Sequence, residues 1–145
     1  MTAAALLVGA AQLLATAGVG VYDPARTWTA ADTETAIVLG ELPQDPPNAV
    51  ALEFYPVRDD PKTTDSTAAI QIRDRGDENP VTVLDRDDVI FDALHGLHDT
   101  TVNGVPVVLV NRLNLMPMST DDQHRRRTVA NYYWQIARPS PYRED

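Results

Sequence analysis

Residues 123–138 read QHRRRTVANYYWQIAR. Within this stretch every second residue is apolar or aromatic, namely Ala130, Tyr132, Trp134 and Ile136. This two-residue period is typical of a half-buried strand. Tyrosine and tryptophan bury large areas when they pack, so we expect this strand to close a sheet that earlier segments form.

Composition limits the class of protein. With 145 residues, 43% of them hydrophobic, the chain is predicted to form one domain over residues 1–145. Cysteine is absent, which excludes disulfides, thiolate metal sites and thiol nucleophiles. The formal net charge of -9 disfavours a domain that grips nucleic acid by neutralising phosphates.

The N-terminal 23 residues, MTAAALLVGAAQLLATAGVGVYD, allow two interpretations. Their apolar run and small residues imitate a secretory signal, which would imply a secreted binding module. However, the first basic residue is Arg26, Gln12 interrupts the run, and its polar-free part is too short to span a bilayer. We therefore favour a largely buried helix that is capped by Thr2 and ends at Gly18.

Further strands are predicted at residues 48–55, 68–75 and 105–110, and 35–42 is a weaker strand candidate. A second helix is expected to begin at an Asp85 cap and to end before Gly96. Polar segments at 57–67 and 111–124 are interpreted as long loops, and the chain ends in a short tail. The predicted fold class is α+β, with a mostly antiparallel sheet of about four strands covered by two helices.

Few residues suggest catalytic chemistry. His95, His98 and Asp99 have a conceivable metal-ligand spacing, but histidines near a helix C-terminus are better explained by favourable interaction with the helix dipole. The three serines lie in no G-x-S-x-G motif, and the glycines form no phosphate-binding loop. We therefore expect no enzyme activity and no cofactor, with a small metal-binding enzyme as the weaker alternative.

The basic run Arg125, Arg126 and Arg127 departs from the acidic trend. It is either a contact with an acidic partner or nucleic acid, or a solvated segment balanced by nearby aspartates. If the strands at 68–75 and 128–138 are neighbours, Arg73 and Arg75 would join the run in one basic strip. Placement of Arg73 and Arg126 on opposite faces would exclude that strip.

Several motifs follow one another in a recognisable order. They are the Leu-rich N-terminal helix with Gly20-Val21-Tyr22, Glu41-Leu42-Pro43 leading into Val50-Ala51-Leu52, residues 70–76 (IQIRDRG), Leu94-His95-Gly96, and the closing strand with Asn131-Tyr132. Together they resemble the tail-terminator proteins of long-tailed bacteriophages, also known as minor capsid or tail-completion proteins. The resemblance covers nearly the whole chain and carries no catalytic residue.

The resemblance implies a virion protein that assembles in the host cytoplasm and has no membrane partner. Such a protein forms a ring, usually a hexamer, on the head-proximal end of the tail tube. The ring stops tube growth and joins a head-tail connector or stopper protein, while DNA passes through its lumen without specific binding. Another neck component, a stopper or head-completion protein, is the nearest alternative.

Contact residues follow from this expectation. The predicted loop 57–67, with Asp59, Asp60 and Lys62, is the candidate for contact with the tail tube protein. Arg125, Arg126 and Arg127, with Arg73 and Arg75, are candidates for salt-sensitive contacts between subunits.

Overall fold

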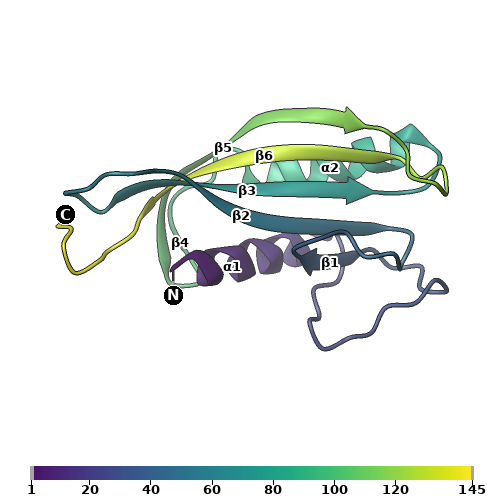
Figure 1. The fold of residues 1–145 in the computed structure, drawn as a ribbon, viewed down its shortest axis with the longest axis horizontal. Coiled ribbons are helices and arrows are strands. Elements are labelled where there is room, and N and C mark those ends of the chain that lie inside the picture. Colours follow the sequence, from purple (N-terminus) through teal and green to yellow (C-terminus); the bar gives the residue numbers. More distant parts are fainter. Residues whose placement is uncertain (1, 145) are drawn as a thin grey trace.

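The computed structural model describes residues 2–144, in which six strands form one sheet in the order β1-β2-β3-β6-β5-β4 (Figure 1). The elements in chain order are α1 (Thr2–Thr16), β1 (Ala36–Leu39), β2 (Ala49–Asp59), β3 (Asp65–Arg75), α2 (Pro80–Leu94), β4 (His98–Val102), β5 (Val105–Met118) and β6 (Arg127–Ala137).

Strand β6 lies between β3 and β5 and carries the largest buried side chains, as the C-terminal pattern predicted (Figure 1). Tyr132 and Trp134 are fully buried and belong to one core cluster with Leu6 of α1 and Ile90 of α2. An aromatic side chain that buries about 200 Å² contributes about 5 kcal/mol before entropy is counted. The strand predicted near the C-terminus is confirmed.

The predicted four-stranded antiparallel sheet is wrong. The sheet has six strands and is mixed, because β1 pairs with β2 in parallel while the other pairings are antiparallel. The prediction missed β4, whose sequence HDTTV has a single apolar residue and whose first four residues are exposed. An exposed edge strand needs no alternating pattern, so its sequence carries little signal.

The two long loops are also shorter than predicted. Of residues 57–67, only 60–64 connect strands, because β2 continues to Asp59 and β3 begins at Asp65. Of residues 111–124, the part up to Met118 belongs to β5. These strand ends project beyond the core, where neither face must be apolar, so the period-2 pattern fades although the main-chain ladder continues.

Both helices end or begin at recognisable signals. After α1, Gly18 adopts a φ of +88°, and Val19 N donates to Leu14 O at 3.0 Å, which is the Schellman arrangement. The cap of helix α2 lies six residues earlier than predicted, because Pro80 occupies the first turn and Asn79 caps the helix by accepting from Val81 N at 3.0 Å. Asp85 is therefore not the cap.

Both helices pack on the same face of the sheet, and the opposite face is covered by neither. On that uncovered face, side chains from four neighbouring strands form a polar ladder. Asn131 Oδ1 accepts from Tyr55 Oη at 2.9 Å and from Gln71 Nε2 at 3.3 Å, and Asn131 Nδ2 donates to Asn114 Oδ1 at 3.0 Å. The uncovered face is thus polar at its centre and fixed by side-chain bonds across β2, β3, β6 and β5.

Candidate contact surfaces

The tip of the β2–β3 hairpin is a tight turn. Asp60 Oδ1 accepts main-chain N–H bonds from Lys62 and Thr63, both at 2.8 Å. These bonds favour the ionised carboxylate and lower the pKa of Asp60. Asp59 accepts from Ser66 Oγ at 2.7 Å. The three predicted tube-contact residues therefore sit together at the projecting end of the sheet, on an ordered turn.

The C-terminal segment fastens this turn to the body of the protein. Arg143 donates to Thr64 O and Ser66 Oγ, both at 3.2 Å, and to the carbonyl oxygen of Arg138. Glu144 N donates to Lys62 O at 2.8 Å. The sequence analysis described this segment only as a tail and missed the buried Arg143. In the sequence, Arg143 is an isolated arginine in a proline-rich segment without a periodic pattern, so nothing local indicated its contacts.

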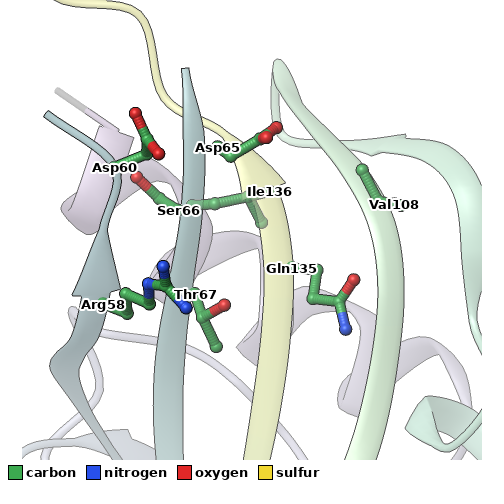
Figure 2. Close-up of a pocket in the computed structure, with 8 residues that line it drawn as sticks. All are labelled: Arg58, Asp60, Asp65, Ser66, Thr67, Val108, Gln135 and Ile136. Carbon is green, nitrogen blue, oxygen red and sulfur yellow. The ribbon is translucent and has the colours of Figure 1, made fainter. Parts of the chain in front are cut away.

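A hollow of about 350 Å³ lies beside the hairpin tip (Figure 2). Its lining residues are Arg58, Asp60, Asp65, Ser66, Thr67, Val108, Gln135 and Ile136. Figure 2 shows that β6 contributes Gln135 and Ile136 on one side, while the hairpin contributes the charged side chains on the other. The Ser66 hydroxyl is already bonded to Asp59 and Arg143. The hollow thus offers polar and charged groups suited to contact.

Arg75 is buried and has a structural role. Its guanidinium donates to three main-chain carbonyls of one proline-rich loop, Pro43 and Pro46 at 2.6 Å and Pro47 at 3.0 Å. Burial, followed by the nearby Arg125 charge, lowers the pKa of Arg75 to about 10. Its side chain therefore holds the loop 43–47 against the end of β3.

The three consecutive arginines separate into different environments. Arg125 is buried, forms an ion pair with Asp121 at 2.6 Å and donates to Gln44 O at 3.1 Å. Arg126 donates to Glu78 O at 3.0 Å, and Arg127 donates to Ser119 O at 2.9 Å. Arg126 and Arg127 retain exposed guanidinium groups, whereas Arg125 is enclosed by its own chain.

The strand pairing on which the basic strip was conditional is present, because β3 pairs with β6 and places Arg75 opposite Arg127. Strand alternation puts Arg73 on the uncovered face with them. Arg126 lies on the helix side instead, because its guanidinium donates to Glu78 O immediately before α2 and Thr128, two residues on, faces Asp87, so the single basic strip with Arg126 in it is excluded. Arg73 itself lies 3.8 Å from Glu53, so part of its charge is compensated.

A charged cluster is buried where α2 meets the sheet. Arg86 NH1 donates to Asp74 Oδ1 at 2.6 Å, and Thr128 Oγ1 donates to Asp87 Oδ2 at 2.8 Å. Burial, opposed by the charge of Arg86 and assisted by the adjacent Asp87, raises the pKa of Asp74 to about 8. Burial also raises the pKa of Asp87. The two carboxyl groups therefore share one cation in a place that water does not reach.

The histidines considered as metal ligands have other contacts. His95 stacks on Phe91 with ring centroids 4.4 Å apart, and its Nδ1 accepts from Arg112 N at 3.0 Å. His98 Nδ1 donates to Gly96 O at 2.8 Å. Among residues 2–144 there is no group of three His, Cys, Asp or Glu side chains that could hold a metal ion.

Comparison with known proteins gives one informative result. No protein-family model matches the chain, and no curated protein sequence matches it. Its fold is similar to that of a chain in the virion of a native gene transfer agent particle, with a TM-score of 0.55 and 17% identity. The match covers 69% of this chain and 78% of that one. The two chains thus share a fold.

Among residues 2–144, no helix is long and apolar enough to cross a membrane.

Strand β5 exposes five large apolar side chains to solvent. These are Val108, Leu109, Leu113, Met116 and Met118. Apolar side chains gathered in this way mark contact surfaces, and methionine is enriched at protein interfaces.

Proposed function

We propose that this protein is a structural component of a phage-like particle and that it caps the tail tube as a ring. The shared fold with a chain of a gene transfer agent virion is the observation that carries this proposal. The order of sequence motifs, which resembles tail-terminator proteins, supports it independently. In this role the ring ends tube growth, presents a joining surface to a connector or stopper protein, and has no enzymatic activity.

The distribution of surface features supports an assembly with two different contacts. The hairpin tip with Asp59, Asp60 and Lys62 projects from one end of the sheet, and it is the proposed tube contact (Figure 1). The exposed apolar residues Leu113, Met116 and Met118 lie in the C-terminal half of β5, toward the other end of the sheet. A closed cyclic ring requires each subunit to present distinct, complementary patches to its two neighbours, and these apolar residues of β5 are the proposed centre of one such patch.

Of the arginines predicted to contact other subunits, the exposed ones are the proposed contacts. Arg73, Arg126 and Arg127 reach the surface, whereas Arg75 and Arg125 are buried against their own chain. The formal net charge of -9 per chain gives an acidic ring, which would let DNA pass through the lumen without adhering.

The mass of the purified protein, measured by light scattering together with electron microscopy, tests the ring. Addition to polymerising tail tube protein of the same particle then tests the role, because a terminator shortens the tubes and caps one end. Binding to the connector without any effect on tube length would instead identify a stopper or head-completion protein. A chain that forms no ring, alone or on tubes, would contradict the proposal.

A further inference from the structure

The sheet has two open half-edges. On one side β1 pairs only with residues 49–52 of β2, so residues 53–59 have no strand neighbour there among the described residues. On the other side β4 reaches only residue 109 of β5, and Val110 bonds with Gly96 and Leu97, so within residues 2–144 no strand pairs with this side of residues 111–118. We call these segments the β2 half-edge (53–59) and the β5 half-edge (111–118).

The two half-edges lie diagonally across the sheet. Three antiparallel pairings separate β2 from β5, so the two strands run in opposite directions. Each half-edge is the C-terminal half of its strand, and the two therefore lie at opposite ends of the sheet. Figure 1 shows this arrangement, with the hairpin of β2 projecting at one end and the end of β5 free at the other.

Main-chain groups on both half-edges point away from the sheet. Gly40 N donates to Leu52 O, so alternation directs the N–H and C=O of Phe54 outward as well. On β5, the N–H of Arg112 points outward and donates to His95. A β-bulge lies between Arg112 and Asn114, and the register after it directs the N–H and C=O of Leu115 outward as well. One residue on each half-edge thus presents a complete donor and acceptor pair to a neighbouring strand.

Prolines limit how far pairing can extend. Pro56 and Pro117 occupy the next outward positions on their strands. Proline has no N–H, so it is tolerated on an edge and blocks a long ladder there. Each half-edge therefore permits a short pairing and resists uncontrolled stacking of chains.

The side chains of the two half-edges are complementary. Leu113 and Met116 of β5 are 53% and 49% exposed, and Val57 of β2 is 41% exposed. The β5 half-edge has one charged residue, Arg112, whereas the β2 half-edge carries Glu53, Arg58 and Asp59 and is net negative. Apolar contact with opposite net charge favours association of unlike edges over like edges.

We propose that the β5 half-edge of one copy pairs with the β2 half-edge of the next copy, which continues the sheet from subunit to subunit around a closed ring. This inference rests on the proposed function. In a cyclic ring all copies have the same orientation relative to the ring axis. Because β2 and β5 run in opposite directions within one copy, β5 of one copy would run antiparallel to β2 of the next copy. The diagonal offset of the half-edges supplies the stagger that tilted strands require when a sheet closes.

Cross-linking in this cysteine-free chain tests the pairing. A double variant, Val57→Cys with Leu113→Cys, is treated with a short thiol cross-linker under conditions where the protein is a ring. The expected result is a ladder of covalent oligomers, about tenfold more abundant than in a control pair because the thiols are held together. The control pair is Val57→Cys with Val81→Cys, because Val81 is 53% exposed on α2 and belongs to neither half-edge.

The outcomes separate this inference from the proposed function. Rings that give no ladder with either Val57/Leu113 or a second pair, Glu53→Cys with Met116→Cys, overturn the edge pairing and leave the ring standing. Dimers from Leu113→Cys alone show that like edges meet, which also overturns it. A chain that forms no ring, either in light scattering or on tail tubes, overturns both. Unfolding midpoints equal to that of the natural chain establish that the variants are folded.

Discussion

Arg86 of α2 donates a hydrogen bond of 2.6 Å to Asp74 at the end of β3, and both side chains are almost completely removed from solvent. Arg86 also donates to Arg75 O at 3.1 Å and to Asn48 Oδ1 at 2.9 Å. One guanidinium therefore joins α2 to the ends of two strands, at a position where its removal leaves a buried carboxyl group without its cation.

Arg86→Ala is expected to lower the free energy of unfolding by about 3–5 kcal/mol above about pH 8, where Asp74 is ionised and would be left buried and unpaired. Urea unfolding measures this loss. The matched control is Arg73→Ala, whose ion pair with Glu53 is 3.8 Å long and partly exposed, so its loss is expected to cost less than about 1 kcal/mol. Equal effects of the two substitutions would contradict a structural role for the buried pair.

Stability is expected to fall as the pH rises from about 5 to about 8, by up to about 1.4 kcal/mol per pH unit for one proton. The pKa of Asp74 is raised from 3.8 in the unfolded chain to about 8 in the fold, mainly by burial. In this window the folded protein binds a proton that the unfolded chain releases. Unfolding by urea at each pH measures the slope, and Asp74→Asn should flatten it. An unchanged slope in that variant would assign the proton to another group.

Arg75 and Arg127 are paired in register but should respond differently to substitution. Arg75→Ala leaves three carbonyls of the loop 43–47 without their charged donor and is expected to cost about 3 kcal/mol. Arg127→Ala is expected to change stability by less than about 1 kcal/mol, because its guanidinium is exposed. If Arg127 contacts a neighbouring subunit, its loss instead lowers the ring mass in light scattering, most clearly at low salt.

Arg143→Ala is expected to release the hairpin tip. The lost bonds to Thr64 and Ser66 should speed hydrogen exchange of amides at residues 62–66 by about tenfold or more, since bonds to a charged donor contribute about 1.5–3 kcal/mol. Tyr142→Ala is the matched control, because that side chain is 92% exposed and should leave exchange unchanged. Unaltered exchange in both variants would show that the turn is held by its own Asp60 bonds.

Some parts of the fold were predictable from the sequence, and others were not. The apolar alternation of Tyr132 and Trp134 predicted β6 because a central strand must bury one whole face. The glycine stop of α1, where Gly18 adopts a positive φ, was also predicted from local chemistry. By contrast, the strand β4 and the outer halves of β2 and β5 were missed, because exposed strands need no apolar period.

The sequence by itself determined the core strands, the two helices, the absence of cysteine chemistry and the acidic net charge, because periodicity, capping and composition are local properties. Only the tertiary structure decided which charges are free. It buried Arg75, Arg125 and Arg143 against carbonyls that lie far away along the chain. It also left the half-edges of β2 and β5 open at opposite ends. Those outcomes depend on strand order and register, which bring together residues that no local pattern connects.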